Sequence, residues 1–304
     1  MIQLGKLKMK KERLIFTLLF MPFLVYIIAF KFVPLVGWGL AFIRYRPGLA
    51  LSQCEFVGFD NFIKIFSDWD RLSQVLTNTF VLSILGILVS PFPLLFAILL
   101  NEVPGKKFKK FVQTFTTIPH FVSWVIVFAL AFSLFSTEGV LNTVLVKIGL
   151  GDKTTNLLAS KNATWWLQAA LNLWKSFGWS AIIYFASISS IDSDLYEAAA
   201  LDGAGRFQKI RYITIPSLKD TYFVILLLQI SNFLNTGLDQ YLAFYNSIIS
   251  DKIMVLDLYA YRLGLVAADY SYSTAVSIVK TVVSIVLLFS INSLSKKIRG
   301  VSIV

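Results

Sequence analysis

Charged residues, cysteine and histidine are all scarce in this sequence of 304 residues. Only 15% of the residues are charged, against about 25% in a typical soluble domain. The single cysteine, Cys54, excludes an internal disulfide and a zinc site built from several cysteines. The sequence has no GxxxxGK[ST] phosphate-binding loop, so we do not expect this chain to hydrolyse ATP. One histidine and no constellation of nucleophiles or metal ligands give little support to any enzyme activity, including an intramembrane one.

Apolar residues dominate instead. They make up 57% of the chain, phenylalanine alone occurs 27 times, and the mean hydropathy is +0.72. This composition indicates an integral membrane protein. The net charge of +11 would suggest a nucleic-acid partner in a soluble protein. Here we assign the basic residues to membrane orientation, and we expect no nucleic-acid partner.

Long apolar runs predict six membrane-spanning helices, at about 14–32, 75–100, 115–135, 165–188, 221–238 and 271–294. We therefore expect one transmembrane domain at 14–294 between short tails at 1–13 and 295–304. No small-residue cleavage site follows Phe30, so the first run is interpreted as an uncleaved span whose helix ends near Lys31 to Pro34. Pro91 and Pro93 predict a kink in the second span. Residues 58–66, in the first loop, predict a short amphipathic helix lying at the membrane interface.

The distribution of Lys and Arg predicts the orientation. The two tails, the loop at 101–110 and the segment at 191–219 hold sixteen of these residues, and the other three loops hold nine. Because the cytoplasmic side carries the excess of basic residues, both termini are predicted to be cytoplasmic. The protein is expected to be a multi-pass membrane protein.

One polar segment between apolar spans, the elbow (residues 191–218), has clear helix signals. Asp192 is a candidate N-cap for a helix that runs to about residue 201. Gly203 and Gly205 predict a turn with left-handed geometry. A second, basic helix is expected from Arg206 to about residue 213, where Pro216 would stop it. The elbow is thus predicted to be a helix–turn–helix.

The elbow also carries a resemblance to a known family. Glu197-Ala198-Ala199 is followed after four residues by Gly203 and, after nine more, by the ITIP run at 213–216. This pattern resembles the EAA loop of bacterial ABC importer permeases, which usually have Leu where Ile215 stands. The wider chain is similar to the sugar-importer branch that takes complex oligosaccharides and polysaccharide fragments, including the maltose and alginate transporter permeases. The stretches that carry this similarity are FKFVP (30–34), LNEV (100–103), IPHFVSW (118–124), WKSFGW (174–179) and YSYSTA (270–275).

The resemblance implies an all-α, six-helix type I importer permease of the bacterial cytoplasmic membrane. Its cytoplasmic elbow is then expected to dock into a groove of an ATPase subunit. Glu197 is then expected to couple the two proteins by pairing with basic groups of the ATPase. Ala198 and Ala199 are small enough to let a helix sit close in a groove. Gly203 would make the bend, and Asp202 would either cap the turn or bond to the second arm.

The resemblance also implies the partners and the cargo. These are two ABC ATPase subunits that bind ATP and Mg, a second homologous permease forming a heterodimer, an extracellular solute-binding protein, and membrane lipid. This chain itself is expected to bind no cofactor and no metal. Its function would be to form the path for an oligosaccharide and to couple it to ATP hydrolysis elsewhere. The alternatives are a non-sugar solute (polyamine, phosphate or amino acid) or a membrane scaffold that borrows the elbow.

Amide side chains around the fifth span are candidates for the substrate path. Gln229, Asn232 and Asn235 are three residues apart, which places them on one face of a helix. Such a stripe suits a water-filled route on which amides satisfy sugar hydroxyls, although helix–helix hydrogen bonding is the alternative. Gln240 and Tyr241 follow the stripe and extend it. Tyr241 would either stack on a sugar ring or belong to an interfacial aromatic belt.

Isolated ionisable residues within the spans give three further candidates. Lys175, in the fourth span, is interpreted either as a substrate-path residue or as a structural partner or snorkelling end. Lys280, in the sixth span, has the same two interpretations, with the structural one favoured. His120 has no acidic neighbour in sequence, so we expect a structural role for it.

Overall fold

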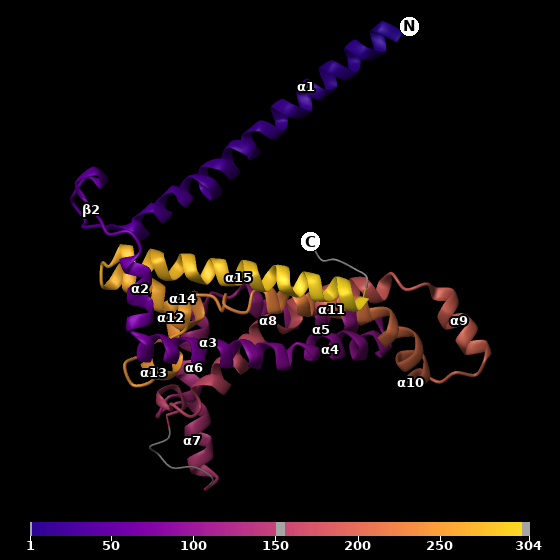
Figure 1. The fold of residues 1–304 in the computed structure, drawn as a ribbon. Coiled ribbons are helices and arrows are strands. Elements are labelled where there is room, and N and C mark those ends of the chain that lie inside the picture. The colour runs from indigo at the N-terminus through magenta and orange to yellow at the C-terminus, as the bar shows by residue number, and fades with distance from the viewer. Residues whose placement is uncertain (1, 150–155, 300–304) are drawn as a thin grey trace. The chain divides into compact units, whose positions relative to one another are not determined.

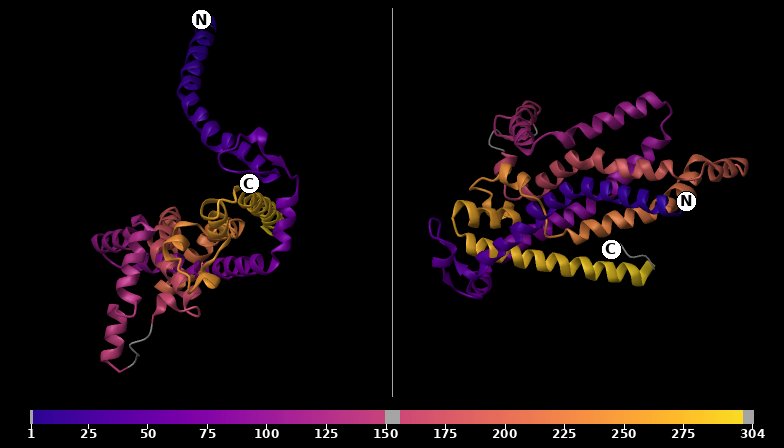
Figure 2. Two further views of the ribbon diagram at one scale, coloured as in Figure 1. Left: turned by 90° about the vertical axis from the view of Figure 1, so that its left-hand side faces the viewer. Right: turned by 90° about the horizontal axis from the view of Figure 1, so that it is seen from above.

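The computed structural model describes the backbone of residues 2–149 and 156–299 and the side chains of residues 15–149, 156–293 and 295–297. The chain divides into two compact units. Unit 1 comprises residues 1–68 and 262–279, and unit 2 comprises residues 69–261 and 280–304. Figures 1 and 2 show that nearly all regular structure is helical, as expected from the long apolar runs and from the resemblance to importer permeases.

Unit 1 begins with a long helix that changes type along its length. It contains α1 (Ile2–Ile27), a π-helical turn (Ile28–Phe32) and a 3-10 helix (Val33–Phe42). The prediction that the helix ends near Lys31 to Pro34 is therefore wrong. Pro34 lies at the start of the 3-10 helix, where a missing backbone N–H leaves no bond unmade. Helical backbone continues to Phe42.

The rest of unit 1 consists of short strands and helices. Two short antiparallel strands of two residues each, β1 (Ile43–Arg44) and β2 (Glu55–Phe56), interrupt the all-α pattern. The amphipathic helix predicted at 58–66 is α2 (Asp60–Ser67). A π-helical turn (Arg262–Val266) and the first part of α15 (Tyr270–Arg299) complete the unit. Within it, Lys64 of α2 forms an ion pair of 3.0 Å with Asp269, just before α15.

Unit 2 holds the membrane bundle and the elbow. Its helices are α3 (Trp69–Val89), α4 (Pro91–Glu102), α5 (Lys106–Phe121), α6 (Trp124–Phe135), α7 (Val140–Lys147), α8 (Thr164–Ser189), α9 (Ser193–Leu201), α10 (Arg206–Lys209), α11 (Ile215–Ser231), α12 (Asp239–Phe244), α13 (Ser250–Ile253), α14 (Leu256–Tyr261) and the end of α15.

Five helical stretches of the described chain are long and apolar enough to cross a membrane: 15–42, 69–102, 124–147, 206–231 and 270–297. The 26-residue helix α8 is also long enough. Gln168, Asn172 and Lys175 lower its hydropathy, so α8 is not one of the five. With α8, the six predicted spans each have a helical counterpart.

Two breaks divide the helices of unit 2. The kink predicted from Pro91 and Pro93 is a break at Ser90, which separates α3 from α4. A second break at Val122 and Ser123 separates α5 from α6, and the Ser123 hydroxyl accepts a hydrogen bond from the N–H of Ile126 at 3.4 Å. The four lysines expected in a turn at 101–110 instead lie within the first five residues of α5, which starts at residue 106 and not near 115.

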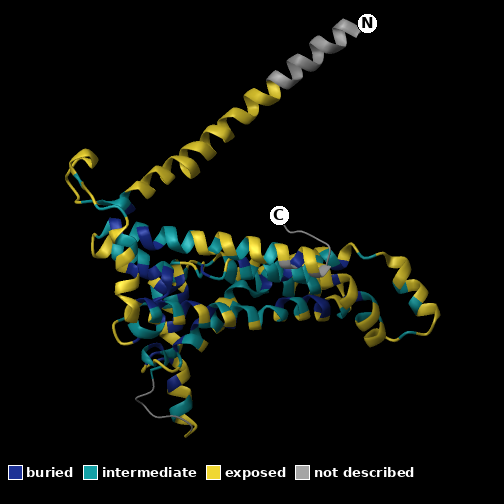
Figure 3. Cartoon of the chain, in the orientation of Figure 1, coloured by how far each residue is buried: buried dark blue, intermediate teal, exposed yellow. Residues whose placement is uncertain are grey.

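Helix α8 is the centre of unit 2, because it packs against α3, α4, α5 and α11. Its core contact with α4 and α11 consists of fully or nearly buried side chains: Ala97, Ile98, Ala181, Tyr184, Ile188 and Leu218. Gly178 is buried where α8 meets α5, and a Cβ at this position would lie 2.7 Å from the backbone nitrogen of Thr117. Figure 3 shows this buried interior and the exposed residues on the outer faces of the helices.

Candidate functional site

The elbow begins as predicted. The Asp192 carboxylate accepts a hydrogen bond of 3.0 Å from the backbone N–H of Asp194 and so caps α9. Gly203 has a φ of +78°, the left-handed geometry expected after the helix. Gly205 does not share it, since its φ of −73° and ψ of 171° are extended. One left-handed residue is enough, because the chain already leaves α9 at Gly203.

Gln208 is a structural residue of the elbow that the sequence reasoning missed. Its Oε1 accepts a hydrogen bond of 2.7 Å from the backbone N–H of Gly205 and closes the turn before α10. The spacing of three residues between Gly205 and Gln208 matches the Gln half of a capping box, and this signal could have identified Gln208. Asp202 is the last residue before the turn, and its side chain is exposed.

The second arm of the elbow does not stop at Pro216, so that prediction is wrong. α10 continues through a π-helical turn (Ile210–Thr214) into α11, and Pro216 lies in the first turn of α11. A π-helical turn changes the hydrogen-bond register, which lets a helix accept a proline that cannot donate. The Tyr196 hydroxyl lies 2.9 Å from the Thr214 hydroxyl and joins the two arms.

Large apolar side chains cover the outside of the elbow. Leu201 is 91% exposed and Phe207 is 87% exposed. Glu197 and Ala198 are exposed beside them, and Ala199 is half-buried. Within unit 2, Figures 1 and 2 show the elbow projecting from the end where α4 turns into α5. Exposed apolar groups at the tip of a projecting segment are typical of a surface that a partner covers.

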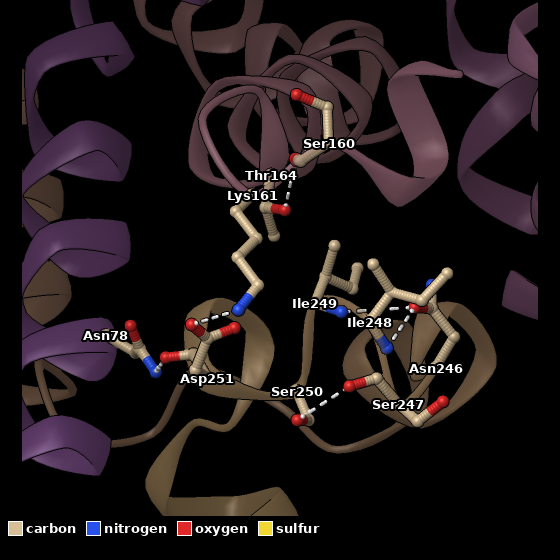
Figure 4. A network of polar contacts seen from close by, with 10 residues as sticks. All are labelled: Asn78, Ser160, Lys161, Thr164, Asn246, Ser247, Ile248, Ile249, Ser250 and Asp251. Atoms are coloured by element: carbon tan, nitrogen blue, oxygen red, sulfur yellow. Dashed lines mark hydrogen bonds and ion pairs between the residues drawn. The ribbon is translucent and has the colours of Figure 1, made fainter. Parts of the chain in front are cut away.

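The opposite end of unit 2 is held by polar contacts around α13 (Figure 4). Lys161 forms an ion pair of 2.8 Å with Asp251, and the Asn78 amide donates to the backbone oxygen of Asp251 at 2.9 Å. The hydrogen bond from Lys161 is the main cause that lowers the pKa of the Asp251 carboxyl. Trp165 donates its indole N–H to the backbone oxygen of Lys252 at 2.9 Å.

A cavity of about 440 Å³ lies inside unit 2. Its wall combines apolar groups with amides and hydroxyls from α3, α4, α8, α11, α12 and the segment after α11. The polar residues that line it are Ser83, Ser90, Gln168, Asn172, Ser176, Ser180, Tyr184, Gln229, Asn232, Asn235, Thr236 and Tyr241.

Helix α8 supplies one continuous wall of this cavity. Gln168, Asn172, Ser176, Ser180 and Tyr184 all line it, and each is four residues after the last. Residues four apart lie on one face of a helix, so this spacing is the signal that could have revealed the wall from sequence. The sequence reasoning did not use it.

The candidates around the fifth span meet at the cavity, although not for the predicted reason. Gln229, Asn232, Asn235 and Tyr241 all line it. They do not share a helical face, because α11 ends at Ser231 and the chain then turns. The Asn232 amide itself helps to end the helix, since it donates to the backbone oxygen of Leu228 at 3.0 Å.

Gln240, predicted as a path residue, is buried and links two helices. It is 2% exposed and does not line the cavity. Its Nε2 donates to both the backbone oxygen and the Oε1 of Gln168, each at 2.8 Å. Its Oε1 accepts from the Nδ2 of Asn172 at 3.0 Å. Gln240 therefore fastens α12 to α8 behind the cavity wall.

The three isolated ionisable residues lie outside the cavity wall. Lys175 donates to the backbone oxygens of His120 at 2.5 Å and Pro119 at 3.3 Å, so it caps the end of α5. His120 stacks on Trp179 with ring centroids 4.5 Å apart. Lys280 forms a half-buried ion pair with Asp257. Among the residues whose side chains are described, no group of three His, Cys, Asp or Glu side chains is placed to hold a metal ion.

Comparisons with known proteins agree with this architecture. Residues 90–300 match the family described as the inner membrane component of binding-protein-dependent transport systems. The permease protein YteP of the polygalacturonan/rhamnogalacturonan transport system of Bacillus subtilis (strain 168) is 39% identical, over 95% of this chain and 92% of its own length. Protein LplB of the same organism is 38% identical, over 95% of this chain and 90% of its own length.

Solved structures show the same fold. The chain matches a crystal structure of a bacterial ABC transporter for import of the acidic polysaccharide alginate, with a TM-score of 0.85 and 33% identity. The match covers 96% of this chain and 98% of that chain. A second structure of the alginate transporter, in complex with its pentasaccharide-bound periplasmic protein, matches equally well. This chain belongs to the family of inner membrane components of binding-protein-dependent transport systems.

Proposed function

We propose that this chain forms the translocation path for an oligosaccharide or polysaccharide fragment in an ATP-driven importer. The observation that carries the proposal is the cavity wall of amides and hydroxyls inside a membrane bundle. Amide and hydroxyl groups can both donate and accept, so they can replace the water around a sugar hydroxyl. A cavity of about 440 Å³ is within the size range of small-molecule sites.

The relatives support a saccharide in particular. YteP is the permease of a polygalacturonan/rhamnogalacturonan transport system. AraP of Bacillus subtilis (strain 168), which is 28% identical over 92% of this chain, is the permease of an arabinooligosaccharide transport system. The matching crystal structures belong to an alginate importer. These relatives support an oligosaccharide and give no support to a polyamine, phosphate or amino acid.

The elbow is proposed to be the contact with the ATPase. Its tip offers Leu201 and Phe207 as exposed apolar anchors, and Glu197 lies exposed on the same arm as Leu201. In this proposal the carboxylate pairs with basic groups of an ATPase groove, Ala198 and Ala199 allow close approach, and Asp202 and Gly203 shape the bend. ATP and Mg are bound by the ATPase subunits and not by this chain.

The other partners complete the importer. An external binding protein delivers the saccharide, a second homologous permease encloses the path with this chain, and two ATPase subunits close on ATP. Both termini and the elbow lie in the cytoplasm in this arrangement. The basic first turn of α5 lies at the same end of unit 2 as the elbow (Figure 1), which agrees with the rule that basic residues accumulate on the cytoplasmic side.

The test is ATP-driven uptake by the assembled complex in vesicles, with Glu197→Ala in this chain. Removing one partner of an interfacial charge pair costs about 2 kcal/mol or more of binding free energy, so the affinity for the ATPase and the rate of uptake should both fall by about tenfold or more. Asp194→Asn is the matched control, because Asp194 is an exposed carboxylate on the same arm. Unchanged uptake in Glu197→Ala would contradict the coupling role. No ATP-dependent uptake with every partner present would favour a scaffold.

A further inference from the structure

The connection between α11 and α12 supplies part of the cavity lining without being helical itself. Asn232, Asn235 and Thr236 from this connection all line the cavity. They lie between the end of α11 at Ser231 and the start of α12 at Asp239. Within the connection, the N–H of Asn235 donates to the backbone oxygen of Asn232 at 2.8 Å and forms a turn. The position of these lining residues therefore depends on what holds the connection to the rest of unit 2.

Gly237 is a point at which this connection is held. Its φ of +87° is the left-handed geometry that glycine adopts at little cost. Its backbone N–H donates to the Oδ2 of Asp257, at the start of α14, at 3.1 Å. A hydrogen bond to an ionised carboxylate is stronger than one between neutral groups. Because Gly237 follows Thr236 directly and Asn235 by two residues, this bond fixes the backbone beside the cavity lining.

The second oxygen of the same carboxylate is bonded to α15. The Oδ1 of Asp257 accepts a hydrogen bond from the Nζ of Lys280, which lies in the part of α15 that belongs to unit 2. Only 14% of the Lys280 side chain and 18% of the Asp257 side chain are exposed. One carboxylate thus joins the connection after α11, α14 and α15. Neither residue lines the cavity, so an effect of the pair on a ligand there has to pass through the chain at Gly237.

The ion pair and the bond to Gly237 contribute in different ways. Replacing a buried ion pair by apolar residues of similar volume is often neutral or stabilising, so the pair by itself is weak evidence for a role in stability. The bond to Gly237 has no such replacement, because an apolar side chain cannot accept from an N–H. Gly237 is exposed, so its N–H can bond to water once the carboxylate is removed. Loss of the carboxylate should therefore release the connection without unfolding the bundle.

We propose that Asp257, oriented by Lys280, is a positioning residue of the saccharide path, which holds Gly237 and so presents the Asn235 amide to a sugar hydroxyl. Asn235 is exposed and lines the cavity, and an amide can both donate to and accept from a hydroxyl. Neutral and acidic sugar units both carry hydroxyls, so this role does not depend on the charge of the saccharide. The inference rests on the proposed saccharide path and adds residues outside the cavity on which binding depends.

Two double variants separate positioning from stability. Asp257→Leu with Lys280→Met, the apolar variant, removes both the ion pair and the acceptor for the N–H of Gly237. Asp257→Asn with Lys280→Gln, the amide variant, removes both charges but keeps a side-chain oxygen that can accept from Gly237. Asp251→Leu with Lys161→Met is the matched control, because these residues form another ion pair of unit 2 and do not line the cavity.

The first measurement is hydrogen–deuterium exchange of the purified, assembled transporter in lipid nanodiscs, without ligand. Overlapping peptides resolve the backbone amides of residues 235–238. In the apolar variant these amides should exchange about tenfold faster than in the wild type, because the bond that holds the connection is lost. The amide variant and the control should exchange like the wild type. Equal exchange in the apolar variant and the wild type would overturn the positioning role.

The second measurement is equilibrium titration of the same nanodiscs, without the binding protein, with trigalacturonate, arabinotriose and spermidine. For each trisaccharide that the wild type binds, affinity in the apolar variant should fall by about tenfold, which corresponds to about 1.4 kcal/mol or one hydrogen bond to the ligand. The amide variant and the control should bind like the wild type. Thermal unfolding supplies the Tm of each variant, and a merely structural role predicts that affinity follows Tm across the series.

The outcomes distinguish this inference from the proposed function. Saccharide binding that is unchanged in the apolar variant overturns the positioning role but leaves the saccharide path. A wild type that binds neither trisaccharide, or only spermidine, overturns the saccharide path, whereas faster exchange in the apolar variant would still support the hold of Asp257 on Gly237. If the apolar variant does not fold, Asp257→Ala with Lys280→Gln removes the same acceptor without added bulk, and the same results are expected of it.

Discussion

The elbow and the cavity wall are stabilised by hydrogen bonds of different sequence range. Hydrogen bonds of the elbow are local: Asp192 to Asp194, Gly205 to Gln208, and Tyr196 to Thr214, eighteen residues later. The bonds that hold the cavity wall join distant segments, such as Gln240 to Gln168, 72 residues apart, and Ser83 to Phe233, 150 apart.

Side-chain exposure follows the same division. The elbow turns Leu201 and Phe207 outward, whereas the cavity wall is backed by buried residues such as Gln168 and Gln240. A segment stabilised by local bonds keeps its shape when its outer side chains change. A wall assembled from four or more helices depends on every contact behind it. Substitutions in the elbow should therefore affect partner binding alone, and those in the bundle should affect stability first.

The largest effect is expected at Gly178, where α8 meets α5. In Gly178→Ala the added Cβ would collide with the backbone of Thr116 and Thr117, and no rotamer change can relieve a clash with backbone. We expect a loss of about 3 kcal/mol in the free energy of unfolding, seen as a lower Tm of the purified chain. Gly205→Ala in the elbow is the control, because its Cβ has no neighbour closer than 3.7 Å. Equal Tm values for the two variants would contradict the expectation that substitutions in the bundle lower stability more than those in the elbow.

The second effect is at Lys175. Lys175→Met removes the charged donor from the backbone oxygens of His120 and Pro119. Hydrogen bonds from charged groups contribute about 2 kcal/mol, so Tm should fall. Because Lys175 does not line the cavity, saccharide binding should stay constant in the fraction that remains folded. Altered saccharide binding with an unchanged Tm would restore the substrate-path interpretation of this lysine.

The third effect belongs to the elbow. Leu201→Ser combined with Phe207→Ser removes two exposed apolar anchors, so the affinity of the ATPase subunit for the purified permease should fall by about tenfold. Tm should not change, because both side chains are almost fully exposed. Phe56→Ser, on the exposed strand β2 of unit 1, is the control and should bind normally. A large fall in Tm would show that the elbow is packed more like the bundle than we infer.

The smallest expected effect is a loss of stability at low pH, caused by the Lys161–Asp251 pair at the end of unit 2 away from the elbow. The pKa of Asp251 is lowered in the folded chain, mainly by the hydrogen bond from Lys161, so the ionised form favours folding. The stabilisation is complete above the unfolded pKa of about 3.9 and is lost as the pH falls through the lower folded value. Tm measured from pH 6 to pH 3 should therefore decline more in the wild type than in Lys161→Gln. Parallel curves would contradict a role for this exposed pair.

The elbow could be predicted from sequence because its signals are short-range. The cap at Asp192 and the left-handed turn at Gly203 depend on residues within a few positions. The break before Pro91 was predictable for the same reason. Pro216 was misjudged, because a proline ends a helix only where the preceding turn cannot change its register, and here a π-helical turn does so.

The cavity could be predicted only in part. Gln229 and its neighbours were found as polar groups in an apolar run, but the end of α11 at Ser231 removed the helical face assumed for them. Gln240 was assigned to the path, yet packing of α12 on α8 turns it inward to Gln168. Such contacts depend on tertiary pairing across about 70 residues, and the periodicity of a single segment does not encode it.

The unbroken helical stretch Arg206–Ser231 has a mechanical consequence. At 1.5 Å per residue it is a rod about 39 Å long, with the turn of the elbow at one end and Gln229 near the other. Helical backbone continues from Phe207 to Gln229 through the π-helical turn, so an angular displacement of the tip is expected to reorient Gln229 as well. If the proposed ATPase binds the elbow, its movement would thus reach the cavity lining through one continuous helix, without rearrangement of loops.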